Sequence, residues 1–180
     1  MPPRSPTGCW CRKASRATCG ATWAPPVLLQ DGWCGAVRQF VELPTGRLVL
    51  ISQVAKAHPA RHVTLTHVSD DGGATWGPCN GTAATMRLPN IALLDVVVDP
   101  ENPDVLYVGS DIGVFRSNDR GATWFWANDS FEEFDLPRVP VTGLGIHPST
   151  HRMYAATMGR GLYYTQATGI VSMRATHVRL

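Results

Sequence analysis

The chain has 180 residues, of which 44% are hydrophobic and 17% charged, and its formal net charge at pH 7 is +2. This composition is that of an ordinary globular protein, and the balance of 16 basic and 14 acidic side chains gives no sign of a surface for nucleic acid or acidic lipid. No apolar run approaches the roughly 18 residues that cross a bilayer, and the basic N-terminus lacks the apolar segment of a signal peptide. We therefore expect no nucleic-acid partner and no membrane insertion, and the sequence indicates no compartment.

Residues 1–33 are predicted to form an irregular tail. Their basic side chains meet no acidic residue before Asp31, which is more typical of a frayed end than of a binding arm. Cys9, Cys11 and Cys19 also crowd this tail, and no second cysteine pair or spaced histidine pair follows them. A zinc site would need such a pair. We therefore expect the thiols to be structural or incidental, with no metal and no cofactor.

An internal repeat organises the rest of the chain. The sequence SDDGGATW at 69–76 returns as SNDRGATW at 117–124, 48 residues later, and RATCGATW at 16–23 keeps only the ending and is predicted to be a degenerate copy. A second block, which begins VDP and ends GVF at 98–115, returns as IHP to GLY at 146–163 with the same spacing. A period of 40 to 50 residues without helical periodicity is typical of one four-stranded propeller blade.

Short β-branched and aromatic runs, separated by Gly, Pro, Asn and Asp, predict the strands of each blade. The second blade also carries an outer strand with Trp124 and Trp126, and the first has a long loop at 55–61. The remaining expected strands are, in chain order, 37–43, 47–54, 62–68, 95–98, 105–108, 112–116, 141–144, 161–164 and a closing strand at 170–174.

The sequence therefore predicts an all-β fold, a β-propeller of four-stranded antiparallel blades, at about 34–80, 91–128 and 140–175. At about 48 residues per blade, the length of 180 residues corresponds to 3.75 blades, and because the first copy is degenerate we expect about 3.5 blades. Closed propellers have four to eight blades. We therefore expect a partial or open propeller whose upstream blades are missing.

The repeated octapeptide has the chemistry of a tight turn between the third and fourth strands. Its carboxylate can accept backbone N–H bonds across the turn, its Gly tolerates positive φ, its Ser adds a local bond, and its Trp can pack beneath the turn. A calcium site or a catalytic pair is the alternative, but Asp71 and Asp119 belong to different blades and are expected to be too far apart to share a substrate. The residues assigned this structural role are Ser69, Asp71, Gly73, Thr75, Trp76, Ser117, Asp119, Gly121, Thr123 and Trp124.

These octapeptides resemble the Asp-box, or bacterial neuraminidase repeat, found in sialidases, xyloglucanase-type glycoside hydrolases, sortilin-like receptors and photosystem assembly factors. The resemblance covers roughly residues 34–166. Residues 136–141 and 155–163 are similar to the last blade of many bacterial propellers, which implies that this chain is a C-terminal part. In the family the Asp-box is a folding element away from the active face.

The resemblance raises glycoside hydrolysis as an activity. The Arg-Ile-Pro signature of sialidases is missing, and LPRVP at 136–140 does not replace it. Xyloglucanase-type carboxylates sit in an Asp-Ile-Gly-Gly turn, and Asp111 begins a similar Asp-Ile-Gly-Val sequence, which makes it the best catalytic candidate. Hydrolysis normally needs two carboxyl groups about 5 to 10 Å apart. Neither the comparable turn at 157–161 nor the loop at 55–61 supplies the second acid.

We therefore predict a non-catalytic propeller scaffold or binding module with a carbohydrate or protein ligand, and Asp111, Arg160 and Trp126 as its candidate binding residues. The alternative is a part of a glycoside hydrolase, xyloglucanase-like or sialidase-like, with Asp111 as one catalytic carboxylate. The aromatic run from Trp124 to Trp126 is expected to pack between blades, with sugar stacking as its alternative. Residues 80–82 and 128–130 also fit the glycosylation sequon, which matters only in a eukaryotic secretory route.

Overall fold

The computed structural model describes residues 8–11, 27–31, 37–52, 66–82, 86–128, 136–167 and 173–175. Within these ranges there is no helix, and so none that is long and apolar enough to cross a membrane. The degenerate repeat at 16–23 and the predicted loop at 55–61 lie outside the described residues.

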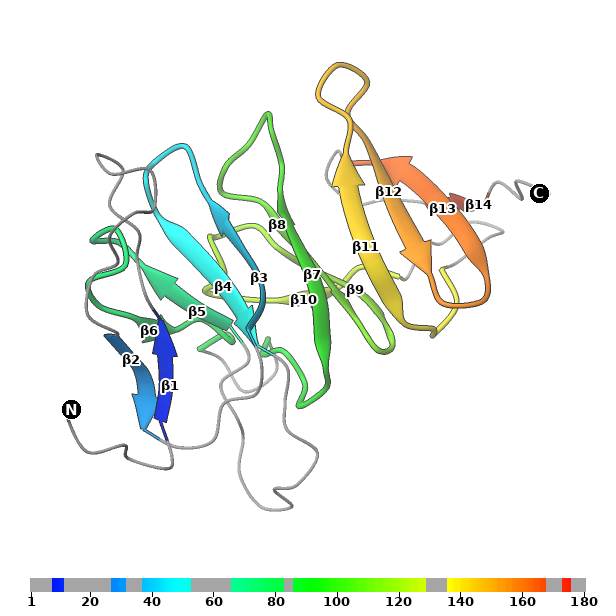
Figure 1. Ribbon diagram of the computed structural model, residues 1–180. Helices are drawn as coiled ribbons and strands as arrows, with labels where there is room; N and C mark the ends of the chain where they lie inside the picture. Colours follow the sequence, from blue (N-terminus) through cyan, green and yellow to red (C-terminus); the bar gives the residue numbers. More distant parts are fainter. Residues whose placement is uncertain are drawn as a thin grey trace, which may run out of the picture.

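Three four-stranded antiparallel sheets follow one another along the chain (Figure 1). In each sheet the strands pair in sequence order, which is the meander expected of a propeller blade, so the predicted fold class is confirmed. The first sheet comprises β3 (Val37–Glu42), β4 (Leu48–Ser52), β5 (Thr66–Ser69) and β6 (Gly77–Pro78). The second comprises β7 (Leu93–Val98), β8 (Leu106–Ser110), β9 (Gly113–Ser117) and β10 (Phe125–Trp126). The third comprises β11 (Val141–Ile146), β12 (Arg152–Thr157), β13 (Gly161–Gln166) and β14 (Met173–Ala175).

Two strands also form in the N-terminal region that was predicted to be irregular. Strands β1 (Gly8–Cys11) and β2 (Val27–Asp31) pair with each other as a separate antiparallel sheet. In Figure 1 this pair lies beside the first sheet, on the side away from the second. The prediction that Trp124 belongs to the outer strand is wrong, because β10 begins one residue later, at Phe125.

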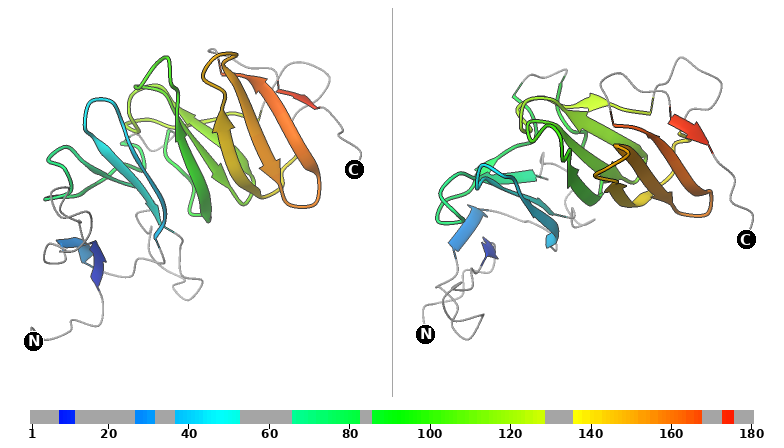
Figure 2. Two further views of the ribbon diagram at one scale, coloured as in Figure 1. Left: turned by 45° about the horizontal axis from the view of Figure 1, so that its top comes forward. Right: turned by 90° about the horizontal axis from the view of Figure 1, so that it is seen from above.

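The innermost strands of the three sheets lie side by side, and β7 contacts both β3 and β11 (Figure 2). From these strands the sheets fan outward as the blades of a partial propeller. Each innermost strand carries a register shift at its first residues, between Val37 and Gln39, between Leu93 and Asp95, and between Val141 and Gly143. A bulge at one place in every blade bends the strand where it enters the sheet.

Each gap between neighbouring sheets is filled by an apolar core. The second sheet is covered on both faces, which explains the near-continuous apolar run of its inner strand. The core between the first and second sheets includes Val49, Ile51, Val96, Val108 and Phe115. The core between the second and third sheets includes Val105, Tyr107, Val114, Met153 and Ala155.

The Asp-box turn of the first sheet is closed by its own side chains. The Asp71 carboxylate accepts hydrogen bonds from the backbone N–H of Thr75 at 2.8 Å and from the Ser69 hydroxyl at 2.7 Å. The Ser69 hydroxyl oxygen accepts in turn from the Gly73 N–H at 2.7 Å. These bonds, led by those from Thr75, lower the pKa of the Asp71 carboxyl far below its usual range.

The turn of the second sheet repeats these bonds. Asp119 accepts from the Thr123 N–H at 2.7 Å and from the Ser117 hydroxyl at 2.8 Å, and the Gly121 N–H donates to Ser117 Oγ at 2.7 Å. Burial opposes ionisation of Asp119, but the bonds from Thr123 and Ser117 outweigh it and lower the pKa of the carboxyl. Its Trp124 indole donates to the Cys79 carbonyl of the first sheet at 2.9 Å, so this turn also joins two blades.

Replacing Asp119 by alanine is expected to lower the free energy of unfolding by about 1–3 kcal/mol, because the N–H of Thr123 and the hydroxyl of Ser117 lose their acceptor. Chemical denaturation followed by fluorescence would measure the change. Asp111→Ala is the matched control, since no hydrogen bond to the Asp111 carboxylate is found within the described residues, and it should shift stability by less than about 0.5 kcal/mol. Equal stability of the two variants would contradict the role of Asp119.

Candidate functional site

The turns of an antiparallel meander divide between two edges of the sheet. Turns that join the first to the second strand and the third to the fourth lie at one edge, and the Asp-box turns are among them. The turn between the second and third strands lies at the opposite edge, where the chain also passes to the next sheet. Asp111 in the β8–β9 turn and Arg160 in the β12–β13 turn therefore lie along one edge, at the bottom of Figure 1. We call it the Asp111 edge.

Equivalent backbone bonds fix both turns to the linkers that precede their sheets. The Asp111 N–H donates to the Ala92 carbonyl at 3.1 Å, and the Met158 N–H donates to the Pro140 carbonyl at 2.8 Å. Asp111, Met158 and Arg160 are all exposed. The Asp111 edge thus presents a carboxylate on one blade and a guanidinium on the next, both carried by anchored turns.

The Asp111 turn is anchored by the side chain of Asn128, a buried residue that is only 3% exposed. Its Oδ1 accepts from the Val114 N–H at 2.7 Å, and its Nδ2 donates to the Leu136 carbonyl at 3.1 Å. Gly113 has φ of +133°, and a Cβ there would overlap Nδ2 of Asn128, so this position requires glycine. The Asn128 amide is therefore bonded inside the fold, and this disfavours Asn128 as a glycosylation site.

Asn80 occupies the same place in the first sheet, 48 residues earlier. Its Oδ1 accepts from the N–H of Thr66 at 2.7 Å and from the Thr66 hydroxyl at 2.8 Å. Sequence reasoning missed this structural asparagine. The signal was available, because Asn80 and Asn128 recur at the period of the Asp-box.

Asp95 is a second residue that sequence reasoning missed. It lies at the bulge of β7, and its carboxylate accepts from the Val96 N–H at 2.8 Å, from Leu144 N–H at 2.7 Å and from the Gln39 side-chain amide at 3.4 Å. These donors come from all three innermost strands. Asp95 therefore joins the three blades at their shared inner side, and its oxygens are occupied.

The aromatic run of the second sheet does not form one stacking platform. Trp124 is 2% exposed and bonded to the first sheet, whereas Phe125 is 42% exposed. Trp126 is half-buried, with its ring edge-on to Phe115 at 4.9 Å between centroids, and the Arg138 guanidinium lies 5.4 Å from the ring centre. It belongs to the outer strand β10, whereas Asp111 and Arg160 lie in the β8–β9 and β12–β13 turns.

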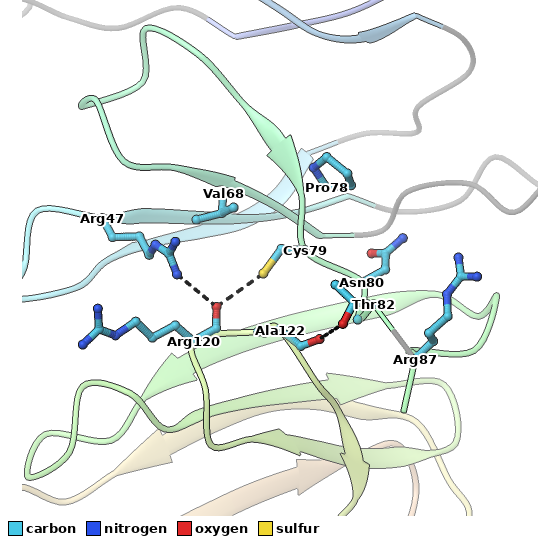
Figure 3. Close-up of a pocket in the computed structure, with 11 residues that line it drawn as sticks. Arg47, Val68, Pro78, Cys79, Asn80, Thr82, Arg87, Arg120 and Ala122 are labelled. Carbon is cyan, nitrogen blue, oxygen red and sulfur yellow. Dashed lines mark hydrogen bonds between the residues drawn. The ribbon is translucent and has the colours of Figure 1, made fainter. Parts of the chain in front are cut away.

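A cavity of about 430 Å³ lies at the seam between the first and second sheets (Figure 3). Three arginines line it, of which Arg47 pairs with Asp70 at 2.5 Å and Arg120 with Asp104 at 2.5 Å. Cys79 is buried in its wall, where burial raises the pKa of the thiol to about 11. The lining includes neither Asp111 nor Arg160. Sequence reasoning gave no sign of this cavity.

Catalysis of glycoside hydrolysis at the Asp111 edge would require a second carboxylate beside Asp111. From residue 37 onward, the described acidic residues other than Asp111 are Asp95, which is occupied by N–H donors, and seven that lie in or beside turns of the opposite edge: Glu42, Asp70, Asp71, Asp99, Glu101, Asp104 and Asp119. Asp111 thus has no second free carboxylate beside it among the described residues. Nor do those residues include a group of three or more His, Cys, Asp or Glu placed to hold a metal ion. The edge can hydrogen-bond hydroxyl groups and pair with charges.

Sequence similarity to curated proteins is weak and partial. The chain is 30% identical to a xyloglucanase of Hypocrea jecorina over 93 residues, which are 50% of this chain and 10% of that protein. It is 29% identical to a xyloglucanase of a Paenibacillus species over 113 residues, which are 56% of this chain and 11% of that protein. The chain thus spans about a tenth of the length of these relatives. No family model matches it.

Similarity to solved structures supports the architecture. The GH74 xyloglucanase from Xanthomonas campestris superimposes with a TM-score of 0.57 at 18% identity, over 86% of this chain and 25% of that one. Chaetomium thermophilum Sqt1 superimposes with a TM-score of 0.56 at 15% identity, over 92% of this chain and 40% of that one. Identities this low show the fold alone. The chain is therefore a partial β-propeller with weak sequence similarity to part of xyloglucanases.

Proposed function

We propose that this chain is a carbohydrate-binding propeller module whose binding surface is the Asp111 edge. The observation that carries the proposal is an exposed Asp111 carboxylate on an anchored turn, with no partner in the described part of the chain. A carboxylate accepts bonds from sugar hydroxyls, and exposed Arg160 on the next blade can donate to them. The weak similarity to xyloglucanases favours a glycan over a protein as the ligand.

Binding without hydrolysis is the better supported form of this function. Glycoside hydrolysis normally uses two carboxyl groups about 5 to 10 Å apart, one on each side of the scissile bond. Asp95, whose partner in the strand register is Gly109, is held by three donors from the inner strands. Its bonds suit a structural role and leave Asp111 without a catalytic partner in the described ranges.

A part in glycoside hydrolysis is the second candidate. Asp111 stands first in an Asp-Ile-Gly turn at the edge of a propeller blade, and both curated relatives reported above are xyloglucanases. In this form Asp111 would supply one carboxylate, and the other would come from residues outside the described ranges.

We expect xyloglucan oligosaccharides to bind to the purified chain, and Asp111→Asn to weaken that binding about tenfold by removing a charged acceptor. Calorimetry would measure the affinity. Asp104→Asn is the control, since it removes a partly exposed carboxylate at the opposite edge and should leave the affinity unchanged. No binding by the unaltered chain would overturn the proposal.

A hydrolysis assay distinguishes the binding module from the glycoside hydrolase. Xyloglucan, β-glucan and a sialoside reporter would be incubated with the chain and with Asp111→Asn, and released sugar measured. The binding module predicts no product from either protein. Product from the unaltered chain that disappears in Asp111→Asn would favour the glycoside hydrolase, because asparagine keeps a hydrogen-bond acceptor but cannot transfer a proton.

A further inference from the structure

The cavity at the seam between the first and second sheets has guanidinium groups in its wall (Figure 3). It lies on the Asp-box edge, opposite to the Asp111 edge, because Arg47 directly precedes β4 and Arg120 stands in the Asp-box turn of the second sheet. Its volume of about 430 Å³ is within the range of small-molecule sites. Among the described residues, three arginines and no acidic residue line it. The lining therefore favours an anion over a cation.

Arg47 is held in place by its ion pair and keeps one nitrogen for a weaker contact. Its Nε and Nη2 donate to the Asp70 carboxylate at 2.5 Å and 2.9 Å, the bidentate geometry that fixes a guanidinium. The third nitrogen, Nη1, donates to the Arg120 carbonyl at 3.4 Å, which is a long bond. Asp70 itself is not part of the lining. A bound anion could therefore gain a stronger bond from Nη1 without moving the guanidinium.

Arg87 is the unpaired cation of the cavity. Its residue is exposed, and its guanidinium has no hydrogen bond or ion pair within the described ranges. The backbone on both sides of it is anchored. The Met86 carbonyl accepts from the Trp124 N–H at 3.0 Å, and the Leu88 N–H donates to the Asn80 carbonyl at 2.8 Å. The fold thus fixes the base of a side chain whose charge is left for a ligand.

The seam between the second and third sheets shows that stacked blades do not require these polar groups. By strand register, Val105 takes the place of Arg47, and Ala127 takes the place of Cys79. Val105 is 4% exposed within the apolar core of that seam, and Ala127 packs against the same core. At these two places the first seam has a guanidinium and a thiol in the wall of a cavity instead. The charge of Arg47 is therefore not needed to join two blades.

We propose that this cavity binds a small organic oxyanion, a carboxylate or phosphate group on a carbon skeleton, between Arg47 and Arg87. Both kinds of group accept N–H bonds from guanidinium in the same geometry. In Figure 3 the two arginines lie on either side of Cys79, so they can approach one ligand from two directions. Half-buried Val68 in the same lining offers an apolar contact for the skeleton. The site is separate from the Asp111 edge and does not rest on glycan binding there.

Titration followed by amide NMR shifts tests the site. Glucuronate and glucose 6-phosphate carry the two oxyanions on skeletons of one size, and glucose is their neutral control. We expect at least one of the anions to shift the amides of Thr82, Gly121 and Ala122 in the lining with a Kd of about 1 mM, and glucose to leave them unchanged. The anion that binds more tightly identifies the group. No shift of these amides by either anion up to about 10 mM, or an equal response to glucose, would overturn the proposal.

Matched variants distinguish this site from a general charge effect. Arg87→Gln removes the unpaired charge, and Arg47→Val gives the first seam the residue type of the second, so each should weaken anion binding about tenfold. Arg38→Gln makes the same charge change at an exposed residue of β3 outside the lining and should leave the affinity unchanged. Circular dichroism checks that each variant folds. An affinity that either cavity variant leaves unchanged, or that Arg38→Gln lowers equally, would refute the site. None of these outcomes depends on xyloglucan binding, so the proposed function is tested separately.

Discussion

Replacing Asn128 by leucine is expected to lower the free energy of unfolding by about 3–5 kcal/mol. Leucine has a similar size but leaves the N–H of Val114 and the carbonyl of Leu136 buried without partners, and each such group costs about 1–3 kcal/mol. The branched side chain also presses on the backbone at Gly113, which already lies against Asn128. Denaturant titration would measure the loss. Hydrogen exchange at the Val114 amide would show whether the Asp111 turn opens.

The same substitution at Asn118 is the control for this prediction. Asn118 is exposed at the Asp-box turn of the same blade, so Asn118→Leu removes an amide without burying an unpaired group. Its effect should stay within about 0.5 kcal/mol. An unchanged unfolding midpoint for Asn128→Leu would show that water or another group replaces the asparagine, and that Asn128 does not hold the turn.

A loss of stability between pH 6.5 and pH 4 is expected from His67. The residue is 1% exposed, neither ring nitrogen has a hydrogen-bond partner, and burial lowers the pKa of the imidazole to about 4. An unfolded histidine has a pKa of about 6.5, so the unfolded state binds more protons than the folded state in this range. The contribution of His67 is therefore complete above pH 6.5, and about 3 kcal/mol is lost as the pH falls to 4.

His67→Phe keeps an aromatic ring at this place and removes the titration. Its free energy of unfolding should be nearly independent of pH over the range in which the unaltered chain loses stability, and at pH 4.5 the variant should be the more stable protein. Asp71 and Asp119 have lowered pKa values, so their stabilising ionisation is lost only below about pH 4 and does not obscure the comparison. Parallel pH profiles of the two proteins would rule out a buried neutral His67.

The blade repeat and the Asp-box turns could be predicted because their causes are local. In each turn the bonded residues lie two to four positions apart, as in Ser69 with Asp71 and Asp71 with Thr75, so the octapeptide contains all the groups that close it. The strand runs could be predicted for the same reason, since alternation and turn residues act over a few positions. Their ends were less certain: β7 begins at Leu93, two residues before the expected start at 95.

The candidate site could be predicted only in part. Asp111 was named as a candidate because it stands in a recognisable turn sequence, and Arg160 stands in the equivalent turn of the next blade. Trp126 was a third candidate, and it lies in the outer strand that was expected for it, with its ring against Phe115. The division between the Asp111 edge and the Asp-box edge follows from strand order, which became clear only once the sheets were paired.

The sequence by itself determined the all-β class, the 48-residue blade and the chemistry of the Asp-box turn, because each depends on residues close together in the chain. The tertiary structure alone decided how the blades are joined. The Asp95 carboxylate meets the Leu144 N–H, the Trp124 indole meets the Cys79 carbonyl, and the Tyr107 hydroxyl meets the Ala167 carbonyl, across separations of 49, 45 and 60 residues. The partners in such contacts have no local sequence pattern in common, and they meet only because stacking the sheets to bury their apolar faces brings them together.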